Sequence, residues 1–438
     1  MAASTMPTRK LTVGVCPPDQ ARLIRPLPAT EEIAAYRHDG GYASGPAADT
    51  FLDLIEDSGL RGRGGAAFPL ATKLRAVRAG DGIRPVVVAN GEEGEPASAK
   101  DRWLLRYRPH LVLDGLRLAA GVVGADRAYL YVSDPAAARA AEAALTDLRL
   151  VRPEVLDVEL RIDVVAVAPT YVAGEETAVV RALNGGPAKP TDKPPRPFES
   201  GVAGRPTLVS NVETLANLPF LHRHGAQAFR SVGTPGSPGT FLATVNGAGR
   251  APGLYELPHG TPLREVVAQH GVSPDEVCGA LLGGYFAGLV NRRVLDLTLD
   301  HETLRGHGTG LGCGAISLLT AADCPVAVSA SVLAYFDREN AGQCGSCFNG
   351  TAAMSAVTEA LRDGTAQRSD LDRLARWSVV LRGRGACGTL DGAANVAASL
   401  LKEFPAAVER HLGPGCEVCV REQFRAACPF EVEIGAFG

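Results

Sequence analysis

The chain has 438 residues, which corresponds to about three domains of ordinary size. With 46% hydrophobic and 21% charged residues, its composition is that of a folded globular protein rather than a disordered one. The formal net charge of −4 leaves no excess of basic residues to hold a phosphate backbone, so nucleic acid is not an expected partner. The longest uncharged runs are short and contain glycine, so no membrane span is predicted. Residues 1–10 lack the apolar core of a signal peptide, and we expect a cytoplasmic location.

The first part of the chain alternates between helical and strand patterns. Residues 1–49 are rich in proline and glycine and predict an irregular lead-in. Apolar residues at helical spacing over 50–60 are followed by a glycine cluster at 62–67 and a second helical stretch. Short apolar runs predict buried strands, with helices between them, at 85–89, 128–132 and 160–168. This alternation predicts a mostly parallel α/β domain over residues 50–235.

The pattern changes after a proline-rich connector at 187–206, which is too stiff for a helix or a central strand. Residues 236–325 predict a small α+β module, with a helix at 263–270 and short strands at 241–245, 253–257, 280–282 and 294–299. Residues 326–412 predict an antiparallel helical bundle, with helices at 326–338, 350–361, 371–381 and 388–411. A tail at 413–438 contains three cysteines.

Two acidic turns and one glycine cluster are candidates for a ligand site. The turn at 90–96 follows a buried strand, at the sheet edge where open α/β folds place ligands, and the turn at 171–177 repeats the theme. Glycines opening a helix present N–H groups to a phosphate, although such a cluster is more often only a turn. This cluster follows a helix rather than a strand, so it does not match the dinucleotide fingerprint. The alternative interpretation of the first acidic turn is a solvated loop.

Several motifs, in chain order, resemble the flavin subunit (51 kDa or F-type) of respiratory complex I, an NADH:quinone oxidoreductase. The same fold recurs in NAD-linked hydrogenase diaphorase and formate dehydrogenase subunits. The resemblance covers about residues 50–411 and identifies the chain as a divergent member. Its motifs are GLRGRGGAAFP at 59–69, NGEEGEP at 90–96 with KDR at 100–102, GEETA at 174–178, KPP at 193–195 and NVETLAN at 211–217.

The resemblance implies an FMN-binding α/β domain, a β-grasp (SLBB-like) module at 236–325 and a four-helix bundle that holds a [4Fe–4S] cluster. It also implies a set of cofactor-binding residues: Gly62, Arg63, Gly64, Gly65, Phe68, Lys73, Asn90, Glu92, Glu93, Tyr171, Gly174, Glu175, Glu176, Lys193, Asn211 and Thr214. Of these, Phe68, Glu176 and Lys193 would face the nicotinamide nucleotide together with Glu95. Glu95 and Glu176 are the candidates for positioning the nicotinamide in catalysis.

The cluster motif departs from the family pattern of Cys-x-x-Cys-x-x-Cys with a fourth cysteine before the last helix. Ala341 occupies the first ligand position, so Cys344, Cys347 and Cys387 remain. In an up-and-down bundle the first and third connections lie at the same end, so these three thiolates can share one cluster. The missing fourth ligand leaves three outcomes open: an iron held by water or Glu339, a three-iron cluster, or no cluster.

Two further features depart from the family or lie outside it. The adenine-stacking aromatics are replaced by Ala76 and Arg196, and Arg196 could stack on the adenine or meet a 2′-phosphate. In the tail, Cys416-x-x-Cys419 with Cys428 is consistent with ferredoxin-like ligation, with zinc bound together with a residue such as His411, or with no metal. The four isolated cysteines are expected to be inert packing residues: Cys16, Cys278, Cys313 and Cys324.

The sequence therefore predicts an NAD(P)H dehydrogenase of the diaphorase type. Electrons from the nicotinamide nucleotide would pass through FMN to a cluster and then to a ferredoxin-like or other iron–sulfur partner subunit. Two alternatives remain at this point. One is a non-catalytic scaffold that docks within a redox complex, and the other is an FMN oxidoreductase that accepts electrons from a ferredoxin.

Overall fold

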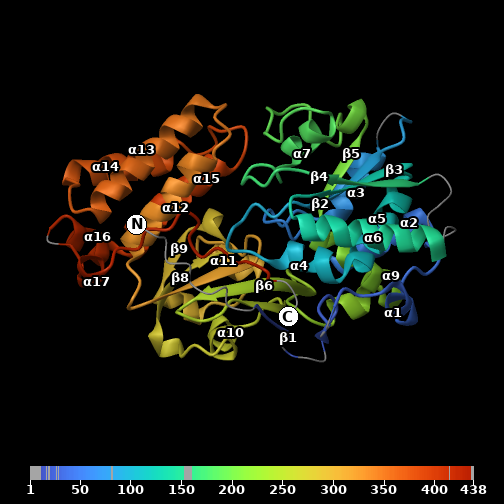
Figure 1. The fold of residues 1–438 in the computed structure, drawn as a ribbon, viewed down its shortest axis with the longest axis horizontal. Coiled ribbons are helices and arrows are strands. Elements are labelled where there is room, and N and C mark those ends of the chain that lie inside the picture. The colour runs from blue at the N-terminus through green and yellow to red at the C-terminus, as the bar shows by residue number, and fades with distance from the viewer. Residues whose placement is uncertain are drawn as a thin grey trace.

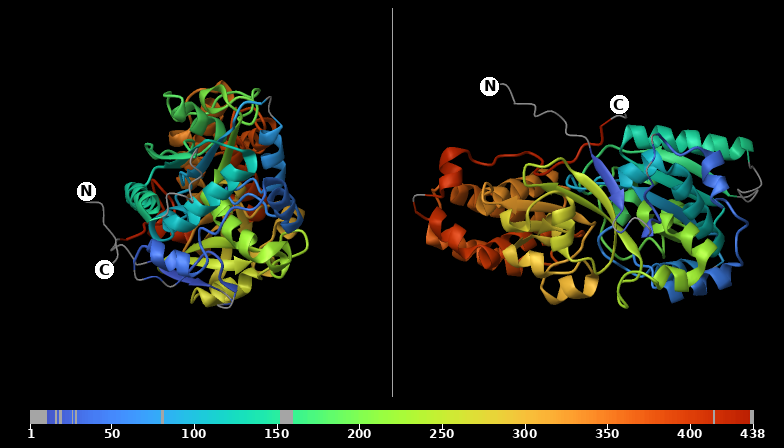
Figure 2. Two further views of the ribbon diagram at one scale, coloured as in Figure 1. Left: turned by 90° about the vertical axis from the view of Figure 1, so that its right-hand side faces the viewer. Right: turned by 90° about the horizontal axis from the view of Figure 1, so that it is seen from below.

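The computed structural model describes residues 11–435, with the exception of 16, 18, 19, 26, 28, 80, 81, 152–159 and 414. The expectation for Cys16 lies outside the described residues. Figure 1 shows an α/β unit formed by the first half of the chain, a second sheet in yellow, and a group of C-terminal helices in orange and red. Seen from below in Figure 2, the second sheet lies between the α/β unit and the C-terminal helices.

The α/β unit is built on a four-stranded, fully parallel sheet with the order β4-β3-β2-β5. Its inner strand β2 (Val86–Gly91) begins with four small apolar residues, Val86–Ala89, that are all buried, as expected for a strand covered on both faces. The other strands are β3 (Arg127–Val132), β4 (Arg161–Ala166) and β5 (Thr207–Asn211). The carboxyl ends of β2 and β5 are therefore neighbours, which brings the turn after β2 next to Asn211.

Helices pack around this sheet: α2 (Ala48–Ser58), α3 (Leu70–Arg78), α4 (Lys100–Tyr107), α5 (Pro109–Val123), α6 (Pro135–Val151), α7 (Glu176–Leu183), α8 (Val212–Ala216) and α9 (Leu218–Arg230). The single helix expected over 101–118 is wrong, because the chain breaks there into α4 and α5. Arg108 has non-helical backbone angles between them (φ −129°, ψ 49°). Pro109 cannot donate a helical hydrogen bond and instead starts α5.

The irregular lead-in expected over residues 1–49 is also wrong for part of that segment. Strand β1 (Thr12–Val15) pairs in parallel with β7 of the second sheet, and α1 (Ile33–His38) is a short helix. Between them, the backbone N–H groups of Leu23 and Ile24 both donate to the buried Glu256 carboxylate at 2.8 Å. The segment is therefore tied to the second sheet by contacts that its own composition does not reveal.

The second sheet has six strands in the order β1-β7-β6-β10-β8-β9. Its strands are β6 (Thr240–Gly247), β7 (Gly253–Pro258), β8 (Val277–Leu282), β9 (Leu289–Asn291) and β10 (Ala315–Thr320), and α10 (Leu263–Gln269) and α11 (His301–Gly306) accompany them. The strand expected at 294–299 is wrong, because Arg292–Asp296 is a 3₁₀ helix. Its apolar residues Val294 and Leu295 are nevertheless buried in the core of this unit, which explains the misleading pattern.

The C-terminal helices are α12 (Pro325–Glu339), α13 (Gly345–Arg362), α14 (Arg368–Val380), α15 (Thr389–Glu403), α16 (Pro405–His411) and α17 (Glu417–Arg421). The last helix expected, 388–411, is divided by Pro405 into α15 and α16, and the second begins at Gly345 rather than at residue 350. Within the described part of the chain, no helix combines the length and apolar character needed to cross a membrane.

The tail after α17 runs back from the C-terminal helices toward the α/β unit, as the right-hand view of Figure 2 shows. It is fastened there by backbone groups: the Val432 N–H donates to the Pro96 carbonyl at 2.9 Å, and the Ile434 carbonyl accepts from Arg106 at 2.8 Å. The tail therefore links α4 and the acidic turn to the far end of the molecule.

Candidate functional site

The acidic turn after β2 contains a buried carboxyl group without a partner. Glu92 is 6% exposed, and neither of its carboxyl oxygens has a hydrogen bond of ordinary geometry among the described residues, although the Gly174 N–H lies nearby. Burial raises its pKa well above the ordinary value, the neighbouring Glu93 and Asp101 raise it further, and the Gly174 N–H offsets this only slightly. Leaving such a group unsatisfied is costly, so Glu92 is poised to hydrogen-bond a bound molecule.

The second acidic turn lies directly against the first. The Asn90 side-chain amide donates to the Gly174 carbonyl at 2.8 Å, which joins the end of β2 to the turn before α7. A Cβ atom at Gly174 would lie 2.5 Å from a carboxyl oxygen of Glu92 and 3.2 Å from its backbone oxygen, so the glycine lets the two turns lie close together. The structure thus brings Asn90, Glu92 and Gly174 together at one edge of the parallel sheet.

Glu93, although next to Glu92, accepts hydrogen bonds from the segment that leads into α4 and from the start of that helix. Its carboxylate accepts from the Ser98 hydroxyl at 2.6 Å, from the backbone N–H groups of Asp101 and Arg102 at 3.2 and 3.1 Å, and from the Arg102 side chain at 3.1 Å. Burial alone would raise the pKa of Glu93, but Arg102 and Lys100 hold it below the ordinary value. In this structure Glu93 anchors the start of α4.

A buried ion-pair network underlies both turns. The Lys100 ammonium lies 2.7 Å from Asp101 and 2.9 Å from Glu213, and all three side chains are almost completely buried. Asn211 donates to the second Asp101 oxygen at 2.6 Å, and Glu213 accepts from the Leu242 N–H of the second sheet at 2.9 Å. Lys100 and Asp101 are visible in the sequence motif, but their pairing with Glu213, more than a hundred residues away, is not.

Two of the expected cofactor residues, Asn211 and Thr214, contact the glycine loop between α2 and α3. The Arg63 N–H donates to the Thr214 hydroxyl at 2.8 Å, and the Arg63 side chain is buried with its guanidinium donating to the Thr240 carbonyl at 2.9 Å. A Cβ atom at Gly64 would lie 3.2 Å from Asn211, so the loop sits close to the end of β5. Arg63, Asn211 and Thr214 thus shape the loop formed by Gly62, Gly64 and Gly65.

Four charged residues from three segments meet beside the second acidic turn. Lys193 of the connector lies 2.7 Å from Glu175 and 3.0 Å from Glu176, and Lys73 of α3 lies 3.6 Å from Glu176. Burial would raise the pKa of Glu176, but Lys73 and Lys193 hold it below its ordinary value, so the carboxylate is ionised. Glu175 caps α7 by accepting from the Thr177 N–H at 2.8 Å. The arrangement leaves Lys73 and Lys193 partly exposed to meet an anionic ligand.

The remaining expected residues of the flavin and nicotinamide site have different surroundings. Phe68, at the entry to α3, is 47% exposed, and its ring is open for stacking. Glu95 accepts from the Tyr285 N–H, in the turn between β8 and β9, at 3.0 Å, and burial raises its pKa to about 7. Tyr171 packs edge-on against Tyr335 and Phe336 of α12, with ring centroids 5.7 and 5.2 Å away. Glu95 and Tyr171 therefore also hold the α/β unit against its neighbours.

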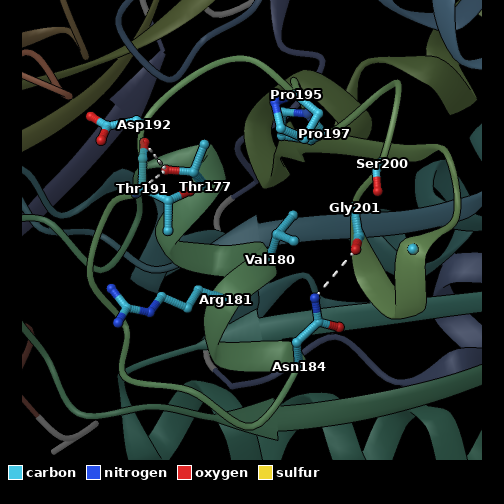
Figure 3. Close-up of a pocket in the computed structure, with 11 residues that line it drawn as sticks. Thr177, Val180, Arg181, Asn184, Thr191, Asp192, Pro195, Pro197, Ser200 and Gly201 are labelled. Carbon is cyan, nitrogen blue, oxygen red and sulfur yellow. Dashed lines mark hydrogen bonds between the residues drawn. The ribbon is translucent and has the colours of Figure 1, made fainter.

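A cavity of about 360 Å³ lies between α7 and the connector, as Figure 3 shows. It is lined by Thr177, Val180 and Arg181 of α7, by Asn184 directly after this helix, and by connector residues that include Pro195, Ser200 and Gly201. None of the expected flavin residues lines this cavity. Arg196, the residue expected at the adenine position, is exposed on the same connector, and its N–H donates to Glu199 at 2.7 Å. Ala76 is half-buried on α3.

The three cysteines expected to bind a cluster line one pocket. Cys344, Cys347 and Cys387 enclose it together with Ala341, Gly342 and the backbone of residues 385–386. The Ala386 N–H points to the Cys344 sulfur at 3.4 Å. Burial raises the pKa of Cys347 to about 12, and the thiols of Cys387 and Cys344 add to the effect. Ala341 contributes to the lining from the position where the family has a cysteine.

Glu339, the expected carboxylate substitute, is not among the described residues of this lining. It pairs with Arg338 at 3.5 Å instead. An oxygen ligand from Glu339 is therefore not preformed.

The cysteine loop is attached to the α/β unit by three polar contacts. Arg181 donates to the Gln343 side chain at 2.9 Å, and Gln343 donates to the Pro190 carbonyl at 2.7 Å. Lys189 donates to the Ala341 carbonyl at 2.9 Å. Sequence motifs did not single out Lys189 or Gln343, and only their polar character next to the cysteines could have suggested a role. These contacts hold the cysteine pocket against the segment that connects α7 to Lys193.

Two family models match this chain. Residues 55–220 match the Nuo51 FMN-binding domain, and residues 327–411 match the NADH-ubiquinone oxidoreductase-F iron-sulfur binding region. The first match contains the glycine loop and both acidic turns, and the second contains the three-cysteine pocket. The two sites described above thus correspond to the two matched regions.

Whole-chain comparisons agree with these matches. The chain is 31% identical over 405 residues to the second F-type subunit of the NADH-quinone oxidoreductase of Rhizobium meliloti (strain 1021), covering 88% of this chain and 96% of that protein. It is 32% identical over 375 residues to the NADP-reducing hydrogenase subunit HndC of Solidesulfovibrio fructosivorans, covering 82% and 76%. A crystal structure of NAD⁺-reducing [NiFe]-hydrogenase in the H₂-reduced state superposes with a TM-score of 0.78 at 31% identity, covering 89% of this chain and 68% of that one.

Proposed function

The chain belongs to the family of F-type subunits of NADH-quinone oxidoreductases, and we propose that it oxidises NAD(P)H at FMN and delivers the electrons to a cluster held by Cys344, Cys347 and Cys387. The family resemblance inferred from the motifs is confirmed, as are the FMN-binding domain, the iron–sulfur region and NAD(P)H-linked electron transfer. One observation carries the proposal: hydrogen bonds of Gln343 and Lys189 hold the cysteine pocket against the segment between α7 and Lys193, beside which we place the nucleotide.

The finer architecture belongs to the same proposal. We assign residues 50–235 to the FMN-binding domain, 236–325 to a β-grasp (SLBB-like) module and 326–412 to a four-helix bundle, with 413–438 as the tail. The mixed second sheet with α10 supports the β-grasp assignment. The packing of α12 against α13 and α15, and of α14 against α15, supports the bundle.

The residues present fit FMN. The unpaired, buried carboxyl group of Glu92 requires an external hydrogen-bond partner, and the glycine loop of Gly62, Gly64 and Gly65 offers space for a close-lying ligand. When bound, FMN takes two electrons from a nicotinamide and passes them on singly. Glu92 and Asn90 would bind and orient the ring system at the sheet edge. The loop N–H groups and Lys73 would hold the phosphate.

The nicotinamide nucleotide would lie beside the four-charge cluster. The exposed Phe68 ring offers a stacking surface, and Glu176, held ionised between Lys73 and Lys193, would position the carboxamide end. Glu95, whose raised pKa keeps it largely protonated below neutral pH, would act as a second positioning group. The exposed Arg196 would favour a nucleotide with a 2′-phosphate. Relatives named for NADH, NAD⁺ and NADP make both nucleotides reasonable substrates.

The electron acceptor in this proposal is an iron–sulfur partner, either a ferredoxin-like protein or a further subunit. Support comes from the relatives, which are named as subunits of NADH-quinone oxidoreductase and of a hydrogenase. Support also comes from the cysteine pocket, which would accept electrons next to the α/β unit and pass them outward. Three thiolates would hold the cluster, and Ala341, which also lines the pocket, would leave the fourth iron without a cysteine ligand.

The proposal is tested on protein purified without oxygen. The visible spectrum should contain a flavin band and a broad iron–sulfur shoulder, and NADH or NADPH should bleach both. Electron paramagnetic resonance of the reduced protein should then show the cluster. A flavin- and iron-containing protein that neither nucleotide reduces would contradict the proposal. Reduction by ferredoxin alone would identify the reversed reaction, and protein without either cofactor after reconstitution would identify a scaffold.

A further inference from the structure

We propose that Cys324, His411, Cys416 and Cys419 bind one Zn²⁺ ion at the end of the C-terminal helices remote from the cluster pocket. The side-chain ligand atoms of these four residues all lie within 4.8 Å of one another. Cys324 directly precedes α12, whereas the cluster cysteine Cys344 follows its other end. A helix of that length spans about 22 Å, so the two sites are separate. This inference does not depend on the proposed electron-transfer function.

The spacing of the ligand atoms suits a single ion. Tetrahedral zinc with bonds of about 2.3 Å to sulfur and 2.0 Å to nitrogen holds its ligand atoms about 3.5 to 3.8 Å apart. The Cys324 sulfur already lies 3.3 Å from His411 Nε2. An iron–sulfur cluster would have to fit several irons and sulfides between its thiolates, which needs a wider cage. The donor set therefore favours one tetrahedral ion.

The imidazole of His411 is oriented for this role by a second contact. Its Nδ1 lies 3.1 Å from the Leu361 carbonyl, which can only accept a hydrogen bond, so Nδ1 carries the proton. Nε2 therefore presents its lone pair toward Cys324. Such a carbonyl partner on the far ring nitrogen is typical of histidines that bind zinc, because it fixes both the ring and the tautomer. His411 is fully buried, as is Cys324.

The pair Cys416 and Cys419 has the geometry of a metal-binding turn. Cys416 precedes the short helix α17, and its sulfur accepts from the Cys419 backbone N–H at 3.4 Å. This hydrogen bond favours a thiolate at Cys416. Three cysteines and one histidine make a closed ligand set without an open position, which is typical of structural rather than catalytic zinc.

Two expectations from the sequence change as a result. Cys324 was expected to be inert packing, but the fold places it among three other ligands. Cys428, which the sequence grouped with Cys416 and Cys419, lies instead against the apolar cluster that contains Tyr335 and Phe336. The zinc would tie the segment after α16 to the start of α12. It would thereby fix the origin of the tail that returns to Pro96.

The test compares metal contents of three proteins produced in medium containing both zinc and iron. The unaltered chain should contain about one zinc per chain, and a variant with Cys416→Ser and Cys419→Ser should lose that zinc while it keeps its iron and flavin. Cys428→Ser is the matched control, because it removes a tail thiol outside the group and should keep the zinc. Replacement of zinc by Co²⁺ should give the absorption of tetrahedral thiolate coordination in the unaltered chain and in the control.

Several outcomes would overturn the zinc assignment. Absence of zinc from the unaltered chain, purified without chelators, would overturn it. Loss of iron rather than zinc in the double variant would also overturn it, because that result indicates an iron–sulfur cluster. A disulfide between Cys416 and Cys419, detected by mass spectrometry in anaerobically purified protein, would also exclude the site. Because the metal content of the unaltered protein is decisive by itself, the result stands even if the double variant fails to fold.

Discussion

The Glu95 carboxyl group accepts a hydrogen bond from the Tyr285 N–H at 3.0 Å and thereby joins the acidic turn after β2 to the turn between β8 and β9 of the second sheet. A second bond, from the Ala97 N–H at 3.3 Å, holds the same carboxyl group in place. Burial outweighs these two hydrogen bonds and raises the pKa of Glu95 to about 7. A junction between two units of the protein thus contains an acid that titrates near neutral pH.

This junction predicts a pH dependence of stability. Between pH 4.5, the ordinary pKa of a glutamate, and about 7, the folded state retains a proton that the unfolded state has lost. The contribution of Glu95 is therefore complete below the lower value and decreases as pH rises through the higher one. The loss is at most about 3.4 kcal/mol, because one pKa unit corresponds to about 1.4 kcal/mol. Glu95→Gln, which cannot titrate, should flatten this decrease when thermal unfolding is followed across the interval.

Replacing Glu92 or Glu93 by glutamine should affect different properties of the protein: FMN binding in the first case and stability in the second. Glu92→Gln should leave the fold stable but weaken FMN binding about tenfold, because the buried carboxyl group has no partner within the described chain. Glu93→Gln should lower the free energy of unfolding by about 3 kcal/mol, because it removes charge-assisted bonds to α4 and Arg102. Flavin titration of both variants measures the FMN affinity, and denaturant unfolding measures the free energy of unfolding. Equal flavin affinity in Glu92→Gln and the unaltered protein would refute the assignment of Glu92.

The cluster with three thiolates should lose one iron readily. We expect mild oxidation of anaerobic protein to produce the electron paramagnetic resonance signal of a three-iron cluster. Ala341→Cys should abolish that conversion, because residue 341 lines the pocket and Lys189 holds its carbonyl at 2.9 Å. Phe348→Cys, an exposed site nearby, serves as the control for merely adding a thiol. Persistence of the three-iron signal in Ala341→Cys would show that the fourth corner lies elsewhere.

Arg196 should determine the choice between nucleotides. Arg196→Phe should lower the rate of flavin reduction by NADPH about tenfold relative to NADH, because a guanidinium available to a 2′-phosphate is replaced by a stacking ring. Arg196→Lys retains the charge, so its ratio of NADPH to NADH reduction rates should lie between those of the unaltered protein and Arg196→Phe. Rapid-mixing measurements with both nucleotides provide the ratio. An unchanged ratio in Arg196→Phe would remove this residue from the nucleotide site.

Sequence alone was sufficient for features that depend on neighbouring residues. The glycine loop, the apolar run of β2 and the acidic turn follow one another over fewer than fifty residues, and together with the later apolar runs they predicted the parallel sheet and the edge at which we propose the ligand site. The convergence of Cys344, Cys347 and Cys387 on one pocket was also predictable, because helices that alternate in direction bring alternate connections together. The prolines at 109 and 405 carried the signal for two helix breaks that the periodicity concealed.

Only the tertiary structure decided which polar groups have partners. Adjacent glutamates 92 and 93 look equivalent in the sequence, yet Ser98 and Arg102 engage one and leave the other unpaired. Cys324 contacts His411, which lies 87 residues later in the chain. Strand β1 pairs with β7, which lies more than two hundred residues later. Local composition carries no record of such contacts, because they arise when hydrophobic burial brings distant segments together and each buried polar atom must then find a partner or remain without one.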